Sequence, residues 1–343
     1  MMRKKQTLRF GIIFALLTVA FVIMGALNAC TGSIAIVPKE VLRILFAGSG
    51  EGSKAADVIW KIRLPRLLAA ALLGGALSVS GFLLQSFFRN PIAGPYVLGI
   101  SNGAKMLVGA VMVFVIRAST DAPYWTIMAA SFLGSLIVTG FVLLFAGRVR
   151  SMAALLITGI MIGSICTAVT NFLVTFADEA GIANLHSWSQ GSFSAVSWRN
   201  LEFSSVVIFL CVAGAVFLSK PMTAYQLGEN YARSMGVNIR AFRIALIALS
   251  SLLSAVVTAL AGPISFVGVA VPHITRLLFG TSKPAVIIPG SFLFGSVFCM
   301  GCDLIARTAF SPSELQISTV TAVFGAPVVI ALMLNRQRGK ENG

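Results

Sequence analysis

Ten apolar runs succeed one another along this 343-residue chain, and they constrain its fold more than any other feature. A helix needs about 20 apolar residues to cross the hydrocarbon core of a bilayer, and each run is close to that length. Only 11% of the residues are charged, whereas a soluble domain carries roughly 25%. We therefore predict an all-α fold, a polytopic membrane bundle of about ten transmembrane helices that forms one domain over residues 1–343. The predicted spans are residues 10–29, 63–84, 96–116, 124–146, 151–176, 201–219, 240–261, 264–279, 285–302 and 316–334, of which the eighth begins near a Gly-Pro pair and is short enough for a half-helix.

The basic residues are distributed unevenly, and their distribution predicts the orientation of the chain. When the N-terminus is placed inside, the inner segments hold 16 of the 26 Lys and Arg and 2 of the 11 acidic residues. The outer segments hold 9 basic and 9 acidic residues, and the four Trp lie at or beyond the outer ends of spans. Both observations match the usual bias of membrane proteins. We therefore interpret the net charge of +15 as a topology signal and not as a nucleic-acid surface, and we expect a multi-pass protein of the cytoplasmic membrane with both termini in the cytoplasm.

An Ala-Gly-Pro segment occurs twice, at residues 93–95 and 261–263, each time between two apolar runs. The predicted topology places the first segment at the inner face and the second at the outer face. The same element at opposite faces is what an inverted-topology repeat, a common feature of transporters, would produce. Coincidence of three small residues is the alternative.

A stripe of small and polar residues runs along the fifth predicted span. Gly159, Gly163, Thr167 and Asn171 follow at intervals of four and so lie on one helical face. Glycines at this spacing let helix backbones approach closely, and hydroxyl and amide groups can hydrogen-bond between helices. The stripe predicts either tight helix packing or one wall of a substrate path.

Lys105 is the one lysine that this topology places at membrane depth. It follows Pro95 by ten positions, which corresponds to about 15 Å along a helix. A lysine at that depth must reach the interface with its long stem, pair with another group, or face water. A wet path suited to an anionic cargo is one hypothesis, and a reach to headgroups or to a carbonyl partner is the other.

Two regions outside the spans could contact partner proteins. In the inner loop 220–243, Ala, Leu and Gly residues favour short helices with small faces that could rest in a groove of a soluble protein, although an ordinary linker is equally compatible. At the predicted outer rim, exposed Arg63, Arg66 and Arg307 could anchor to lipid headgroups or receive carboxylates from a docking protein.

Residues for enzymatic chemistry are scarce. The two histidines, His186 and His273, are far apart in the sequence, and no Asp or Glu lies in the interior of a predicted span, since Glu202 is only the second residue of 201–219. A local metal motif and a proton-coupled carboxylate relay therefore lack candidates, and there is no Walker A loop. Cys299 and Cys302 form a C-x-x-C that we interpret as buried packing, with a redox or metal role as the alternative. We expect no catalytic residue, metal ligand or cofactor in this chain, and a separate subunit as the energy source.

At this point a series of motifs resembles the iron-siderophore and cobalamin permeases of ABC importers, the FecCD type. The motifs follow in order over residues 60–335: R-L-P-R at 63–66, Gly81 through Gln85, Asn90-Pro91 with Ala93 and Pro95, G-I-S-x-G-A at 99–104, Leu227-Gly228, G-P-I-x-F-V-G at 262–268, P-H-x-x-R at 272–276, D-x-x-A-R at 303–307 and G-x-P at 325–327. Two places depart from the family pattern. Lys105 replaces a small or apolar residue, and Glu314-Leu315-Gln316 replaces the usual Leu-Pro.

The resemblance implies a permease that works as a pair, with two cytoplasmic ATPase subunits that bind the ATP and an extracytoplasmic substrate-binding protein. It also implies roles for particular residues. The outer arginines receive acidic residues of the binding protein, the loop 220–239 couples to the ATPases, the turn after residue 88 belongs to the cytoplasmic gate, and the fifth span lines the path. The residues concerned are Arg63, Arg66 and Arg307 for docking, Ala224, Leu227, Gly228, Ala232 and Gly236 for coupling, Asn90 and Ile92 for the gate, and Lys105, Gly159, Gly163, Thr167 and Asn171 for the path.

The resulting hypothesis is a permease subunit of an ATP-driven importer for a ferric siderophore, with cobalamin or haem as alternative cargo. We expect a heterodimer with a related second permease, and a homodimer is the alternative. An ion-coupled secondary carrier and a polytopic membrane enzyme are rivals from other classes. The absent intramembrane carboxylates argue against the first, and the scarce histidines argue against a metal-dependent form of the second.

Overall fold

The computed structural model describes residues 2–32, 36–47, 54–114, 124–146 and 152–341, and this part of the chain is helical without a strand. All ten predicted spans coincide with helices, which confirms the polytopic all-α fold. The elements are α1 (Met2–Cys30), α2 (Pro38–Ala47), α3 (Lys54–Asp57), a π-helical turn η1 (Val58–Arg63), α4 (Leu64–Phe88), a 3₁₀ turn η2 (Pro95–Leu98), α5 (Ile100–Phe114), α6 (Tyr124–Ala146), α7 (Met152–Val174), α8 (Glu179–Ser189), α9 (Trp198–Phe217), α10 (Ser219–Leu227), α11 (Glu229–Ser234), α12 (Ile239–Ala261), α13 (Val267–Phe279), α14 (Pro284–Thr308) and α15 (Ile317–Glu341).

Helix length separates the spans into two groups. Within the described residues, seven helices are long and apolar enough to cross a bilayer, and three apolar helices are shorter. The shorter ones are α5, α13 and the apolar part of α15, Ile317–Ala331. The half-helix expected after residue 263 is therefore present as α13, which has 13 residues. At 1.5 Å per residue it is about 20 Å long, less than the hydrocarbon thickness.

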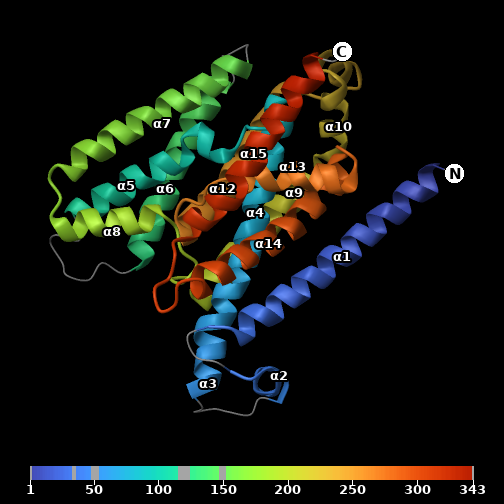
Figure 1. Cartoon of the computed structure of the whole chain (residues 1–343). Helices are drawn as coiled ribbons and strands as arrows, with labels where there is room; N and C mark the ends of the chain where they lie inside the picture. Colours follow the sequence, from blue (N-terminus) through green and yellow to red (C-terminus); the bar gives the residue numbers. More distant parts are fainter. Residues whose placement is uncertain (1, 33–35, 48–53, 115–123, 147–151, 342–343) are drawn as a thin grey trace.

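The central helix of the bundle is α4 (Figure 1), which packs against α9, α12, α13 and α14. In the apolar 18-residue stretch of this part of the chain, 89% of the residues are buried. The sequence permits this burial because glycines lie where neighbouring backbones cross: a Cβ at Gly81 would lie 1.7 Å from the carbonyl oxygen of Gly268 on α13. Small residues at such crossings replace the hydrophobic driving force that is missing between helices in lipid. The crossing of α4 with α13 is thus a backbone-to-backbone contact.

Each Ala-Gly-Pro segment lies between a long buried helix and a short one. After α4 the chain turns into η2 and enters α5 through Gly99, which has φ +76°. After α12 it turns through Gly262, with φ +72°, and enters α13 after Phe266, with φ +63°. The two segments therefore occupy corresponding places in the chain, α4–α5 and α12–α13. The inverted repeat itself stays a prediction.

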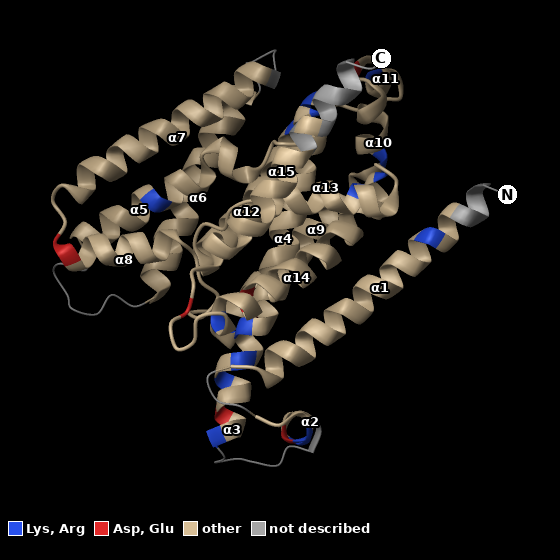
Figure 2. Ribbon diagram, viewed as in Figure 1, with Lys and Arg blue, Asp and Glu red and all other residues tan. Residues whose placement is uncertain are grey.

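The ends of the bundle differ in their additional helices. The free ends of α1 and α15 lie on the same side as α10 and α11, and α2 and α3 lie at the opposite end (Figures 1 and 2). We call these the inner and outer ends, after the charge bias of the sequence. The short helices α2 and α8 were not among the predicted elements.

Candidate translocation path and docking surfaces

A charged network lies at the outer end, where α4 meets α14. The Nε of Arg66 donates to both carboxylate oxygens of Asp303, at 3.0 and 3.2 Å. Its Nη1 donates to Glu314 at 2.9 and 3.2 Å. Arg307, one turn after Asp303 on α14, pairs with the same carboxylate at 3.2 Å and donates to the Oδ1 of Asn28 at 2.6 Å. One buried carboxylate thus faces two guanidinium groups, which offset the cost of its desolvation.

The expectation that the outer arginines are exposed at a rim is wrong. Arg63 and Arg66 are 5% and 8% exposed, and the side chain of Arg307 is also 8% exposed. Arg63 donates to the carbonyl oxygens of Ala29 and Cys30 at the end of α1, at 2.7 and 3.0 Å. The physical reason is that carbonyls at helix ends and the Asp303 carboxylate satisfy these cations inside the chain. Their role in docking stays a prediction.

Asp303 was missed as a site residue because it lies just beyond the predicted span 285–302. In the structure it belongs to α14 and is 1% exposed. A signal was present in the sequence: Asp303 and Arg307 are four residues apart, the spacing of an ion pair on a helix.

At the inner end, the loop 220–239 folds as the expected pair of short helices. α10 ends at Leu227 and α11 begins at Glu229, with Gly228 between them at φ +142° and ψ +148°. Only glycine adopts this backbone conformation without strain. Glu229 pairs with Arg243 on α12 at 2.7 Å, which fixes α11 against the bundle.

The structure divides the predicted coupling residues between exposed and buried positions. Leu227 is 69% exposed, Gly236 is exposed, and Ala224 and Gly228 are partly buried. Ala232 is 0% exposed, so it packs within the chain and does not offer a surface to a partner as expected. A small residue marks close packing, and here the close neighbour is the chain itself. Tyr231 and Met235, 47% and 62% exposed, complete the exposed apolar surface.

Arg89 joins the coupling helix to the predicted gate. It ends α4 in the left-handed conformation, with φ +49°, immediately before Asn90. Its Nη2 donates to the backbone carbonyl oxygen of Tyr225 on α10 at 2.5 Å. Its guanidinium also lies over the Tyr225 ring, 4.9 Å from the ring centre. Burial raises the pKa of Tyr225, so the phenol stays neutral beneath this cation. A displacement of α10 would therefore change the contacts that Arg89 makes at the end of α4.

The gate turn itself is held by its own backbone. The Oδ1 of Asn90 accepts a hydrogen bond from the backbone N–H of Ile92 at 3.2 Å, and the Asn90 carbonyl accepts one from Ala93 at 3.1 Å. Ile92 is 36% exposed at the tip of the turn. Gln85 reaches from the last turn of α4 to the carbonyl of Val269 on α13 at 3.0 Å, which ties the turn to the neighbouring half-helix.

The stripe on α7 has two parts with different surroundings. Gly159 and Gly163 pack against η2 and the start of α5: a Cβ at Gly163 would lie 2.9 Å from the Asn102 amide nitrogen and 3.0 Å from the Cα of Gly99. Asn102 also donates to the carbonyl of Gly163 at 3.1 Å. This half of the stripe is a tight helix contact, the packing alternative given above. Its role in lining a path stays a prediction.

The other half of the stripe lines a small polar cavity with Lys105. Thr167 and Asn171 of α7 and Lys105 of α5 surround a volume of about 200 Å³, which we call the Lys105 cavity. Its remaining lining is mostly hydroxyl and amide: Tyr96, Ser101, Asn102, Thr170 and Ser189, with Pro263. Within the described ranges no carboxylate pairs with Lys105. An unpaired ammonium among hydroxyl groups is suited to an anionic group of a small ligand.

Cys299 and Cys302 are both buried free thiols in α14. A Cβ placed at Gly74 of α4 would lie 2.6 Å from the Cβ of Cys299, so this part of α14 is in close contact with α4. Among the described residues no group of three or more His, Cys, Asp and Glu could hold a metal ion.

Comparison with known proteins places this geometry in one family. Residues 16–335 match the FecCD transport family. The chain is 36% identical to the vitamin B12 import system permease protein BtuC of Escherichia coli over 327 residues, 94% of each chain. It is also 36% identical to BtuC of Klebsiella pneumoniae, over 94% of this chain and 93% of the other. A solved structure described as a metal-chelate type ABC transporter, in an inward-facing conformation, superposes with a TM-score of 0.83 at 27% identity, over 95% of this chain and 99% of that one. The chain therefore belongs to the FecCD transport family.

Proposed function

We propose that this chain is the membrane-spanning permease subunit of an ABC importer and that its cargo is an anionic metal chelate, a ferric siderophore. The similarity to metal-chelate and vitamin B12 permeases supports the class of transporter. The single observation that supports an anionic cargo is the Lys105 cavity, where a cation without a carboxylate partner among the described residues lies among hydroxyl and amide groups. Cobalamin is the second candidate, favoured by the 36% identity with BtuC.

Replacement of Lys105 tests the cargo. Lys105→Met is expected to lower uptake of an anionic ferric siderophore about tenfold, because a hydrogen bond to a charged group contributes about 1.5–3 kcal/mol. Lys105→Arg keeps the charge and is expected to retain most of the uptake. Lys61→Met, at a side chain that is 73% exposed at the outer end, is the control for loss of one positive charge. Initial rates of labelled siderophore and labelled cobalamin uptake are measured side by side.

The outcomes separate the cargo from the transporter class. If the chain supports cobalamin uptake that does not depend on Lys105 and supports no siderophore uptake, the siderophore is not the cargo. That result does not contradict the proposal that the chain belongs to an ABC importer. Uptake of either cargo that persists without the ATPase subunit contradicts the importer. We propose that the two ATPases dock at the inner end, that a second permease completes the path, as a heterodimer, and that a binding protein docks at the outer end, above the Arg66–Asp303 network.

The exposed surface of α10 and α11 offers a test of ATPase docking. Leu227→Glu is expected to uncouple transport and to reduce copurification of the ATPase at least about tenfold, because it places a charge in the centre of an apolar contact. Leu227 is preferable to Gly228 as a target, since any side chain at Gly228 strains the backbone whatever it contacts. Phe310→Glu, at a residue 65% exposed at the outer end, is the matched control. Unchanged copurification with Leu227→Glu would place the ATPase elsewhere.

A further inference from the structure

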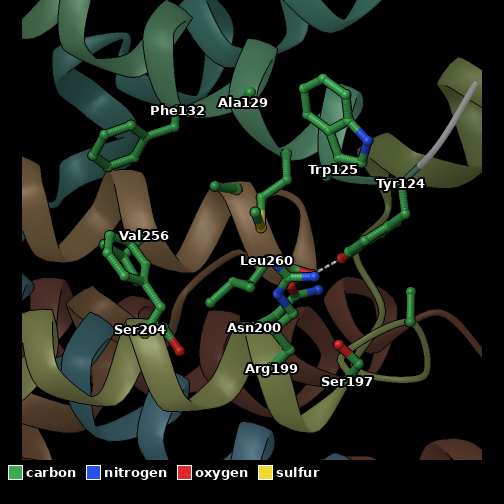
Figure 3. A pocket seen from close by; sticks show the side chains of 14 residues that line it. Tyr124, Trp125, Ala129, Phe132, Ser197, Arg199, Asn200, Ser204, Val256 and Leu260 are labelled. Carbon is green, nitrogen blue, oxygen red and sulfur yellow. Dashed lines mark hydrogen bonds between the residues drawn. The ribbon is translucent and has the colours of Figure 1, made fainter.

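A second cavity opens at the outer end of the bundle, between the first turns of α6 and α9 (Figure 3). Its volume of about 1000 Å³ is at the upper end of the range for small-molecule pockets. Both helices pack against α12, and Val256 and Ala259 of α12 line the cavity. We call this cavity the α6–α9 crevice. None of its lining residues belongs to the Lys105 cavity.

The deeper part of the crevice is apolar. Met128 and Phe132 of α6 line one wall and Phe203 of α9 lines the other. Phe203 is 71% exposed. Phe132 lies eight residues after Tyr124, which is about 12 Å along the helix. That depth is comparable with half of the roughly 30 Å hydrocarbon core, so the apolar wall lies at the level of acyl chains.

The mouth of the crevice is polar and carries one positive charge. Figure 3 shows Arg199 and Ser197 at the same end of the crevice as Tyr124. The Tyr124 hydroxyl donates to the carbonyl of Leu260, which ties the start of α6 to the end of α12. Arg199 is exposed, and no carboxylate of the described residues pairs with it. A guanidinium without a carboxylate partner, above an apolar groove, is complementary to a phosphate group above an acyl chain.

Aromatic residues place the mouth at the level of the headgroups. Trp125 is 63% exposed on the first turn of α6, and Trp198 begins α9 beside Trp60, with ring centres 6.4 Å apart. Trp and Tyr gather at the membrane–water interface, where their rings are apolar on one side and hydrated on the other. The charge at Arg199 and the aromatic residues therefore share one level, and the apolar wall continues inward from it.

We propose that the α6–α9 crevice binds one anionic phospholipid, phosphatidylglycerol, with its phosphate at Arg199 and an acyl chain along Phe132 and Phe203. The bound lipid fills a cavity that would otherwise separate α6 from α9, so it supports the outer end of α6. The proposal rests on the position of the chain in a membrane and on these contacts. It does not depend on the cargo or on ATP, so its failure leaves the proposed function standing.

Photo-crosslinking tests the proposal. The full-length chain is reconstituted in phosphatidylethanolamine vesicles that contain a photoactivatable phosphatidylglycerol, and the labelled peptides are mapped by mass spectrometry. Label is expected on residues 124–132 and 199–204. Arg199→Gln is expected to lower this label about fivefold, which corresponds to about 1 kcal/mol, and to leave label from photoactivatable phosphatidylethanolamine unchanged.

A second pair of variants tests occupancy without altering charge. Ala129→Trp places an indole in the crevice. It is expected to lower label from both lipids at least about tenfold, because the indole occupies the space of the lipid acyl chain. Leu133→Trp, one turn later on α6 and 54% exposed outside the crevice, is the matched control and keeps the label. Unfolding temperatures are compared for the two Trp variants.

Three results would overturn the proposal. The first is equal labelling of Ala129→Trp and Leu133→Trp, which would mean that no lipid occupies the crevice. The second is equal labelling by the two lipids together with no effect of Arg199→Gln. This result would show that the crevice does not select an anionic headgroup. The third is capture of a second protein chain by a photoreactive residue at position 203, which would make the crevice a protein interface. Because Arg199 is exposed, its variant is expected to fold, and it decides the outcome even if a Trp variant does not fold.

Discussion

Gly81→Ala is expected to abolish the folded state. The added Cβ would lie 1.7 Å from the carbonyl oxygen and 2.4 Å from the carbonyl carbon of Gly268. Both groups are backbone within helices, so the clash is relieved only if α4 and α13 separate along their crossing. We expect a loss of more than about 3 kcal/mol, above the roughly 1–3 kcal/mol of overpacking in which side chains can shift. Fluorescence-detected size-exclusion chromatography of the expressed chain measures the folded fraction.

The matched control is Gly140→Ala on α6, where an added Cβ meets no atom within 4 Å. This variant is expected to unfold at the same temperature as the parent or slightly higher, since alanine favours a helix over glycine by up to about 1 kcal/mol. If Gly81→Ala and Gly140→Ala gave equal folded fractions, the backbones of α4 and α13 would not touch as described.

Asp303→Ala is expected to destabilise the chain by about 3–5 kcal/mol, the cost of removing one partner from a buried ion pair. Without this carboxylate, Arg66 and Arg307 would face one another with side chains that are 10% and 8% exposed. Glu314 contacts the same Arg66, but its side chain is 50% exposed. Glu314→Ala is therefore the control, with an expected loss below about 1 kcal/mol. Thermal unfolding in detergent compares the two variants.

Removal of the remaining charges separates electrostatics from packing. Replacing Arg66 and Arg307 by Met in the Asp303→Ala background is expected to recover part of the lost stability, because a buried network can be replaced by apolar residues at little cost. A triple variant less stable than Asp303→Ala would show that the arginine contacts to carbonyls and to Asn28 matter more than the Asp303 charge.

Hydropathy was sufficient to locate the helices that span the membrane, because each must satisfy its own backbone hydrogen bonds in lipid and so requires a continuous apolar run. The same criterion misplaced the end of α14, since Asp303 lowers the local hydropathy although it lies within the helix. Its neutralising partner Arg66 is 237 residues away in the chain. Contacts over such separations arise from helix packing, and no local pattern encodes them.

Periodicity predicted which residues share a face but not what the face contacts. Thr167 and Asn171 line the Lys105 cavity, whereas Gly159 and Gly163, on the same stripe, contact η2 and α5. The small residues of loop 220–239 predicted close packing in the same way. Ala232 shows the limit, because its neighbour proved to be the chain itself and not a partner. A small side chain indicates that a neighbour lies close, but it does not indicate which segment or protein that neighbour is.

The buried position of α4 has a consequence for the direction of signalling. This helix of 25 residues carries Arg66 near its outer end, and Arg89, at its C-cap, contacts α10 at its inner end. If one helix couples two binding sites, the coupling free energy is the same in either direction, because linkage between two binding sites is reciprocal. If the binding protein and the ATPases dock as proposed, docking at the outer surface would change nucleotide affinity at the inner surface by the factor with which nucleotide changes docking. Each partner would then influence the binding of the other through the same helix.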